Sequence, residues 1–371
     1  MQIKGKYNTA IIFNENVDEA SRAQITEFCN QEIFADAVIR IMPDVHAGKG
    51  CVIGYTANLT DQVVPNLIGL DIGCGILSTR LGKFKPGYDK LDKFIRRSIP
   101  YGFERNKYAD PEKYDMNFIS ELQESCEFLG IKFADHLKGI GSLGGGNHFI
   151  ELAEDSQKNK WLLIHSGSRN FGLQVATWHQ DKAFHNSRES GSNIARHFAY
   201  LEGQDREDYF RHMKTAQHYA RLNRKEMTGR ILMCFGIKEP EDQFETIHNY
   251  INFNDNIIRK GAISAHSGEQ VLIPLNMRDG SILAVGKGNR EWNFSAPHGA
   301  GRRLSRTQAK KQLDLNDFKK SMKHIWSSTI SEKTKDEAPM AYKPKREIIE
   351  LIGETVEVKD ILKPVYNFKA E

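Results

Sequence analysis

The chain has 371 residues, of which 39% are hydrophobic and 27% charged, a composition typical of a globular protein with a large core. It has neither a signal-peptide core nor the roughly eighteen uninterrupted apolar residues of a membrane helix, so we expect a soluble cytoplasmic protein without membrane contact. The net charge of +4 predicts no general attraction to nucleic acid, and five cysteines without close pairs indicate reduced thiols.

Short β-prone runs dominate residues 37 to 82. The runs AVIRIM, CVIGYT and NLIGLDIG are apolar and are separated by glycines, so we expect buried strands that end in loops.

The region from 88 to 138 is charged and helix-prone. Within it, the apolar residues of FISELQESCEFLGIKFADHL recur at steps of three and four, which predicts an amphipathic helix.

A glycine-rich turn at residues 141 to 146 precedes a predicted hairpin. Its strands would be HFIEL and WLLIHSG, and antiparallel pairing would place His148 beside His165. Residues 172 to 260 are rich in helix formers, and we expect His248 on or beside a helix. VLIPLNM and SILAVG predict strands around a tight turn, and a basic helical stretch and a strand-rich end follow. No repeat or linker marks a domain boundary.

Four segments place potential metal ligands beside glycines or at strand ends. In DIGCG, Asp71 and Cys74 flank a turn that would let both reach one ion, although a buried strand end is the commoner explanation of this motif alone. His148, His165 and His248 come from three other segments, and each alone is more often structural. Together these groups suit a transition metal ion, with the thiolate favouring zinc or iron on softness.

Three segments favour nucleotide or phosphate binding. The two-residue period of a strand puts Asn147 and Glu151 on one face, and Arg169 in HSGSR could hold phosphate oxygens bidentately. His298 precedes a glycine- and arginine-bearing segment that we expect to open a helix, with its amides facing a phosphate that His298 attacks. The alternative is a proline-glycine turn, with the basic residues from 302 to 323 on a solvated helix face.

The motifs DIGCG, GGGNHFIE, HSGSR, the pair His248-Asn249 and PHGAGR occur in the order and rough spacing of the RtcB RNA ligases. MPDVHAGKG, RKGA, DEAPMAYK and PVYNFK extend this resemblance from about residue 42 to the C-terminus. The resemblance implies an α+β fold in a single large mixed domain over residues 1–371. In such a fold, β-sheets form a central metal and nucleotide pocket surrounded by helices.

The resemblance also implies roles for individual residues. His298 matches the histidine that carries the guanylate, and Arg169 falls where the family binds RNA phosphate. The residues that match the ligands of two manganese ions, with Cys74 as the bridge, are Asp71, Cys74, His148, His165 and His248. The residues that match nucleotide contacts are Asn147, His148, Phe149, Ile150, Glu151, His248, Asn249, Pro274, Leu275, Asn276, Met277, Ser281, His298, Gly299, Ala300, Gly301, Tyr342 and Lys369. Among them, Glu151 would face the guanine and Tyr342 would stack on the base.

The implied activity is a GTP- and Mn²⁺-dependent ligation of an RNA 3′-phosphate or 2′,3′-cyclic phosphate to a 5′-hydroxyl, through histidine-GMP and RNA-ppG intermediates. The chain departs from the family where Pro-Leu-Asn-Met-Arg at 274 to 278 replaces Pro-Gly-Ser-Met-Gly. It is also shorter than many relatives. We therefore expect an active enzyme with an altered preference for RNA ends.

Two other functions are compatible with the same residues. One is a metal-dependent hydrolase that opens RNA cyclic phosphates or removes terminal phosphates without GTP. The other is a non-catalytic protein that binds RNA ends, although such a protein would not need a nucleophilic histidine beside five ligand-type residues. The motifs identify neither the physiological RNA, in repair or splicing, nor a requirement for an activating protein.

Overall fold

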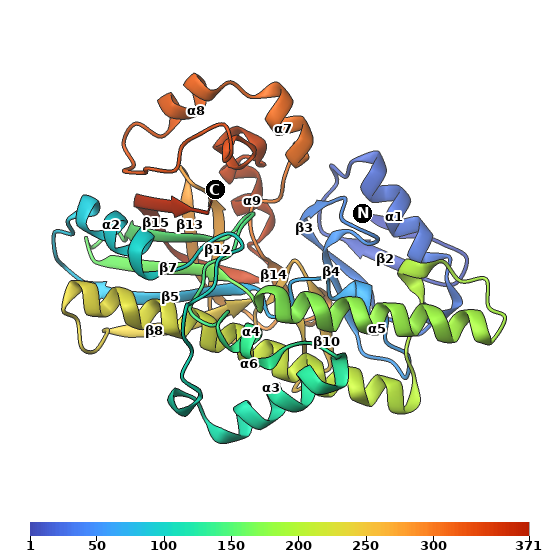
Figure 1. The fold of residues 1–371 in the computed structure, drawn as a ribbon. Coiled ribbons are helices and arrows are strands. Elements are labelled where there is room, and N and C mark those ends of the chain that lie inside the picture. Colours follow the sequence, from blue (N-terminus) through green and yellow to red (C-terminus); the bar gives the residue numbers. More distant parts are fainter. Residues whose placement is uncertain (371) are drawn as a thin grey trace.

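The structure, a computed structural model, describes residues 1–370, in which two large sheets are flanked by helices (Figure 1). The helices are α1 Glu19–Cys29, α2 Tyr88–Ser98, α3 Met116–Leu129, α4 Phe133–Leu137, α5 Arg169–Glu189, α6 Gly203–Phe235, α7 Arg306–Gln312, α8 Leu315–Ser321 and α9 Lys345–Leu351. The strands are β1 Gln2–Lys4, β2 Thr9–Ile12, β3 Arg40–His46, β4 Ile53–Asn58, β5 Gly75–Gly82, β6 Phe149–Glu154, β7 Lys160–Ser166, β8 Asp242–Ile247, β9 Asn249–Asn252, β10 Ile257–Lys260, β11 Ala262–Ser264, β12 Gln270–Asn276, β13 Gly280–Gly286, β14 Ser295–Pro297 and β15 Val356–Lys369. This mixed architecture confirms the predicted fold class.

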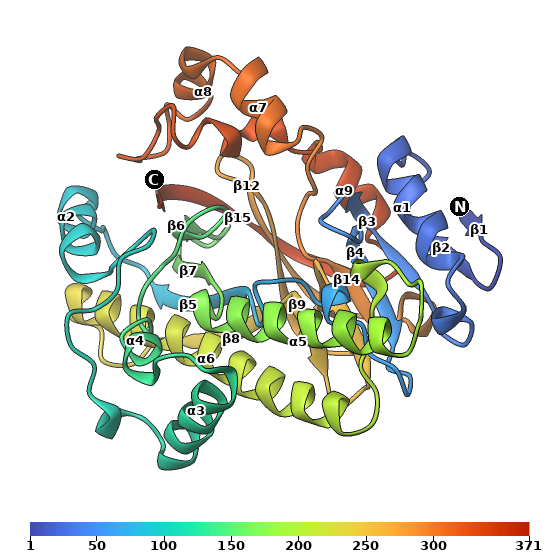
Figure 2. The same ribbon diagram turned by 45° about the vertical axis from the view of Figure 1, so that its right-hand side comes forward.

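The larger sheet has seven strands in the order β12-β13-β15-β6-β7-β5-β8, all antiparallel. The second sheet has six strands in the order β1-β2-β3-β4-β10-β9, and β11 pairs with β14 in a small two-stranded sheet. Helices α5 and α6 lie along one side of the molecule, while α7 and α8 lie at the opposite side (Figure 2). In the part of the chain that the structure describes, no helix is both long and apolar enough to cross a membrane.

The topology of the seven-stranded sheet brings four strand ends together. The start of β5 pairs with the end of β7 and with the end of β8, through Gly75 opposite Ser166 and Ile247. The start of β6 pairs with the end of β7, through Phe149 opposite His165. Residues that immediately precede β5 and β6, end β7 or follow β8 therefore converge at one edge of the sheet.

Two buried side chains of α6 hold this edge. The guanidinium of Arg224 donates to the carbonyl oxygens of Gly73 (2.7 Å) and Ser166 (2.5 Å) and forms an ion pair with Glu245 of β8 (2.8 Å). Asn223 accepts hydrogen bonds from the backbone amides of the glycine-rich turn and donates to the β7 end. Because Arg224 and Asn223 are both fully buried, these bonds are strong constraints on the geometry of the edge.

The hairpin, the helical region before it and the strands β12 and β13 confirm the sequence predictions. The helix-rich prediction for residues 172 to 260 holds through α6, but β8, β9 and β10 occupy its last part. The prediction of a strand at NLIGLDIG is wrong: Pro65–Leu67 form a 3-10 turn, and β5 begins only at Gly75. Gly69 and Gly73 have positive φ angles of 94° and 70°, outside the regular β region, and the chain bends or turns at or next to both residues. The predicted strand-rich C-terminal end is confirmed and forms one long strand, β15.

Candidate metal centre and nucleotide pocket

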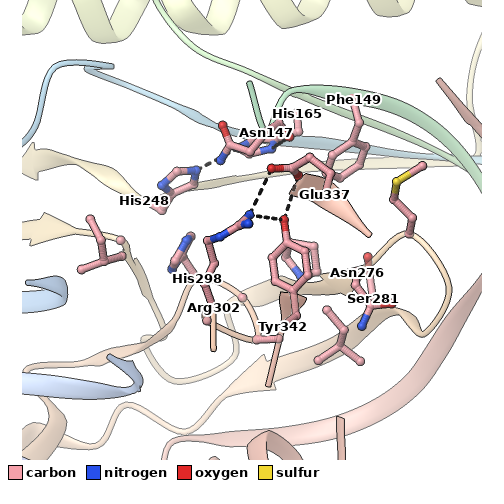
Figure 3. A pocket seen from close by; sticks show the side chains of 18 of the residues that line it. Asn147, Phe149, His165, His248, Asn276, Ser281, His298, Arg302, Glu337 and Tyr342 are labelled. Carbon is pink, nitrogen blue, oxygen red and sulfur yellow. Dashed lines mark hydrogen bonds and ion pairs between the residues drawn. The ribbon is translucent and has the colours of Figure 1, made fainter. Parts of the chain in front are cut away.

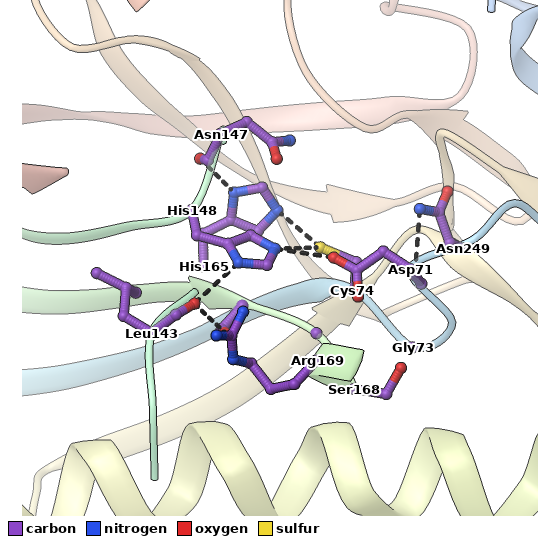
Figure 4. A network of polar contacts seen from close by, with 12 residues as sticks. Asp71, Gly73, Cys74, Leu143, Asn147, His148, His165, Ser168, Arg169 and Asn249 are labelled. Atoms are coloured by element: carbon purple, nitrogen blue, oxygen red, sulfur yellow. Dashed lines mark hydrogen bonds and ion pairs between the residues drawn. The ribbon is translucent and has the colours of Figure 1, made fainter. Parts of the chain in front are cut away.

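Five of the predicted side chains meet at the converging strand ends. Figure 4 shows four of them, Asp71, Cys74, His148 and His165, and Figure 3 shows the fifth, His248. The Cys74 Sγ lies 3.4 Å from His148 Nε2 and 3.2 Å from His165 Nε2. His148 Nε2 is also 2.9 Å from Asp71 Oδ2, and His165 Nε2 is 3.0 Å from His248 Nε2. The donor atoms form two triads that share Cys74, each compact enough to hold one metal ion.

The hydrogen bonds of the two hairpin histidines favour metal binding. His148 Nδ1 lies 2.8 Å from the Leu143 carbonyl and His165 Nδ1 lies 3.1 Å from the Asn147 carbonyl, so each Nδ1 carries the proton and donates it. The Nε2 lone pairs of both rings then point into the cluster, towards the Asp71 carboxylate and the Cys74 sulfur. Lone pairs facing an anion repel one another unless a cation lies between them, so this donor set fits a metal pair.

Burial controls the protonation of the cluster. Burial, followed by the nearby Asp71 charge, raises the pKa of the Cys74 thiol well above its usual value, so a thiolate here needs a cation beside it. For Asp71, burial opposes ionisation, but without a metal ion a proton on His148 Nε2, 2.9 Å from Oδ2, outweighs burial and lowers the pKa; a metal ion between the two atoms would take the place of that proton. Burial also lowers the pKa of His165 and His248 well below the usual value, which keeps both imidazoles neutral as ligands require.

His298 lies beside this cluster, at the end of β14. Its ring centroid is 4.9 Å from that of His248, and its Nδ1 is 2.6 Å from Oδ2 of Asp44 on β3. Asp44 is completely buried, and its carboxylate accepts the Nδ1 proton of His298. The Nε2 of His298 is therefore left with a free lone pair, which is what a nucleophile needs.

A pocket of about 270 Å³ opens next to His298 (Figure 3). Sixteen residues predicted to contact the nucleotide line it: Asn147, Phe149, Glu151, His248, Asn249, Pro274, Leu275, Asn276, Met277, Ser281, His298, Gly299, Ala300, Gly301, Tyr342 and Lys369. They come from β6 and the residues before it, the junction of β8 with β9, the strands β12, β13 and β15, the segment that begins at His298, and the segment before α9. The structure thus brings together residues that are more than 200 positions apart in the sequence.

Three predictions about the site need correction. Ile150 is fully buried in the core on the opposite face of β6, because successive side chains of a strand alternate. His148 faces the metal cluster and does not line the pocket. The segment after His298 does not open a helix: α7 begins at Arg306 behind a Ser305 capping box, so its first amides are already engaged.

Glu337 is a buried carboxylate of the pocket for which no role was predicted. It is 2% exposed, accepts from the Tyr342 hydroxyl at 2.7 Å and forms an ion pair with Lys369. Arg302 and Arg306 also reach it, at 3.2 Å and 2.7 Å. Burial alone would raise the pKa of Glu337, but these three cations lower it to about 2. Arg302 and Arg306 therefore bind a buried carboxylate. Only the basic residues after Arg306 can belong to the solvated helix face that was predicted over residues 302 to 323.

Glu151 is the second buried carboxylate of the pocket, and its environment is different. Asn367 donates to it at 2.8 Å, and Lys369 is the nearest cation. Burial outweighs both and raises the pKa of Glu151 to about 8. The pocket therefore contains two different carboxyl groups: Glu337 is ionised at neutral pH, whereas the charge of Glu151 depends on the ligand that binds.

The altered loop at residues 274 to 278 packs against the segment that follows His298. Pro274 accepts a hydrogen bond from the Ala300 amide at 3.2 Å, and Met277 is buried against α8. Gly301 has a φ of 73°, and a Cβ there would lie 2.3 Å from the carbonyl oxygen of Asp44. A glycine is therefore required where the His298 segment crosses β3.

Arg169, which we predicted to bind RNA phosphate, lies outside the nucleotide pocket. It lines a second, larger groove together with Asp71 and His148.

His248 follows β8 instead of lying on a helix, because its amide donates to the Cys74 carbonyl at 2.9 Å and continues the pairing of β8 with β5. Asp44 and His46 also belong to the site, and the only sequence signal for them is their position in MPDVHAGKG.

Comparison with known proteins identifies close relatives. The family model described as "tRNA-splicing ligase RtcB" matches residues 24–370. The "RNA-splicing ligase RtcB" of Escherichia coli K12 is 32% identical over 367 residues, which cover 89% of this chain and 90% of that protein. The "tRNA-splicing ligase RtcB" of Nanoarchaeum equitans is 27% identical over 403 residues, covering 85% and 84% of the two chains.

Proposed function

The chain belongs to the RtcB family of RNA ligases, and on this basis we propose that it uses GTP and manganese to join an RNA 3′-phosphate or 2′,3′-cyclic phosphate to an RNA 5′-hydroxyl. The observation that carries the proposal is the position of His298. Its imidazole lies between a nucleotide-sized pocket and a metal-ligand cluster, with Nδ1 held by Asp44 and Nε2 free. Neither competing function requires a histidine in this arrangement.

The proposed reaction uses His298 twice. Its Nε2 attacks the α-phosphorus of GTP, the new N–P bond displaces pyrophosphate, and Asp44 stabilises the positive charge that develops on the imidazole. The guanylate then passes to an oxygen of the RNA 3′-phosphate, which frees His298 and leaves an RNA-ppG end. The 5′-hydroxyl of the second RNA attacks the 3′-phosphorus of that end, and GMP departs. A bound manganese pair would polarise the phosphates and offset their charge at the cluster of Asp71, Cys74, His148, His165 and His248.

We assign guanine recognition to Glu151 on β6 and Lys369 at the end of β15, which lie close together on two paired strands. The Watson-Crick edge of guanine carries two adjacent N–H donors beside a carbonyl oxygen, which complements a carboxylate next to an ammonium group. Glu151 would accept from the two donors, and Lys369 would donate to the carbonyl oxygen. Tyr342 remains the candidate for stacking on the base.

Because Glu151 has a pKa of about 8 in the empty pocket, GTP affinity should depend on pH. In the empty pocket, the interactions of Glu151 with Asn367 and Lys369 do not overcome the effect of burial, so Glu151 is protonated below its pKa. The N–H donors of guanine bind the ionised carboxylate, so GTP binding at lower pH must first remove this proton. We expect GTP to bind more tightly as the pH rises from about 6 to about 8, by up to roughly tenfold per unit. Calorimetry across this range measures the trend. Glu151→Gln should remove the part of the pH dependence of GTP affinity that comes from this carboxyl group and leave only the part that comes from titration of GTP itself. The same pH dependence in wild type and Glu151→Gln would contradict the assignment.

The proposed function is tested with two single-stranded RNAs. One carries a 3′-phosphate and the other a 5′-hydroxyl, and we expect a joined product only when GTP and manganese are both present. A hydrolase would instead open a cyclic phosphate without GTP and form no joined product. A non-catalytic protein that binds RNA ends would bind no divalent ion in a metal titration.

A further inference from the structure

A second groove reaches the metal-ligand cluster from the side away from the nucleotide pocket. It has a volume of about 840 Å³ and is lined by Asp71, His148 and Arg169, whereas the nucleotide pocket is lined by His165 and His248. Figure 4 shows Arg169 on the opposite side of the cluster from Asn147, which lines the nucleotide pocket. Four of the five ligand residues are therefore divided between the two cavities, and a molecule in the groove could place a phosphate at the metal centre without entering the nucleotide pocket.

The rim of the groove exposes an aromatic ring beside a basic side chain. It is lined by residues 101 to 105 of the segment YGFERNKY. Phe103 is 105% exposed, Arg105 is exposed, and the segment continues into the exposed Lys107 and Tyr108. A fully exposed aromatic ring is uncommon on a folded protein, and exposed rings close to cations are typical of surfaces that bind single-stranded nucleic acid.

The backbone of this rim is fixed on both sides of Phe103. The Gly102 amide donates to the Gly144 carbonyl at 2.9 Å, and the Gly102 carbonyl accepts from Arg169 Nη2 at 2.7 Å. On the other side, the Asn106 amide group donates to two carbonyls of the segment after α4, at 2.9 Å and 2.6 Å. The ring of Phe103 is thus held in solvent next to an arginine of the groove instead of being exposed by a loose loop.

Close packing supports the position of that arginine. Arg169 has a φ of 56° and also donates to the Ser142 hydroxyl at 3.1 Å. Gly144 has a φ of 87°, and a Cβ there would lie 1.9 Å from Arg169 Nη1. Acidic groups are present too: Glu104 lies on the rim, and Asp135 pairs with Arg105 at 3.4 Å. The groove is therefore of mixed charge, with Arg169 beside Asp71 at its inner end and Arg105 beside Glu104 and Asp135 at its rim.

We propose that this groove holds the single-stranded end of the RNA that carries the 3′-phosphate, and that Phe103 stacks on a base of that strand. The inference rests on the proposed function and names where one substrate lies. Of the two RNA ends, only the 3′-phosphate end has a terminal anion for Arg169 and the metal centre to bind. A base can stack on Phe103 only when it is unpaired, so the groove selects single-stranded ends.

Substitution of Phe103 tests the proposal in the full ligation reaction. We expect Phe103→Ala to raise the KM for the 3′-phosphate RNA about tenfold, because one base-aromatic stacking contact is lost. The KM for the 5′-hydroxyl RNA and the guanylation of His298 should not change. Phe103→Trp should retain wild-type KM values. Met233→Ala is the matched control, since Met233 is 75% exposed and lines neither cavity.

A binding measurement separates this inference from the proposed function. In Phe103→Trp, a short RNA with a 3′-phosphate should quench the added tryptophan fluorescence, with the signal of the native tryptophans subtracted through the wild-type protein. No quenching, or a Phe103→Ala effect only on the 5′-hydroxyl strand, overturns the inference. Quenching by this RNA in a protein that never ligates would support the groove assignment and overturn the proposed ligase activity.

Discussion

Replacing His298 with alanine should abolish the covalent guanylate and reduce ligation by at least about 10⁴-fold. No other histidine in the described residues combines a carboxylate partner on Nδ1 with a position on the wall of the nucleotide pocket and beside the cluster. Metal content should be unchanged, because His298 belongs to neither donor triad. The effect would then be chemical and would not reflect loss of the metal centre.

The measurement is acid-labile labelling of the protein after incubation with labelled GTP and manganese. His185→Ala is the matched control, since His185 is exposed on α5 and pairs only with Glu189, one turn along the helix. Label that persists in His298→Ala would show that another residue carries the guanylate. Label lost in both variants would show that the histidine substitutions act through folding.

Much of the fold could be predicted because its strands and helices have clear periodicities. The hairpin of β6 and β7 is an example: its glycine turn and two apolar runs fixed both the pairing and the closeness of His148 to His165. NLIGLDIG was misread because it is apolar enough for a strand, and only the backbone reveals that its glycines turn the chain twice. The apolar composition of a segment indicates that it is buried, but it does not show where the backbone changes direction.

The metal-ligand residues could be predicted from their chemical types, but their convergence depends on strand order. Cys74 and His248 are 174 positions apart, and they meet only because β5 pairs with β8. The misplacement of His248 on a helix follows from the helix-rich sequence before it. A local pattern cannot show that β8 starts a few residues later and joins the edge of the sheet.

Asp44 and Glu337 went unassigned for a different reason. Each is a single carboxylate within a short motif, and nothing nearby in the sequence shows that it is buried. Their partners, His298 and Lys369, are separated from them by 254 and 32 positions. A buried carboxylate is informative only when its partners are known, because burial without them would be very unfavourable.

Asp44→Asn should slow the guanylation of His298 by roughly 10³-fold with little change in GTP affinity. The amide that replaces the carboxylate has the same size, but it carries no charge to stabilise the imidazole as the N–P bond forms. It can also present its NH₂ group to Nδ1, which would shift the ring proton to Nε2 and remove the attacking lone pair. Asp44 lines neither cavity, so the loss should appear in the rate of the chemical step.

Single-turnover guanylation at saturating GTP measures that rate, and equilibrium binding of GTP measures the affinity separately. Thermal unfolding and metal content serve as controls, because Asp44 is buried and one of its carboxylate oxygens has no hydrogen-bond partner. A structural role would weaken GTP binding and lower the unfolding temperature together with the rate. A normal rate in a folded Asp44→Asn variant would instead show that His298 is activated without this carboxylate.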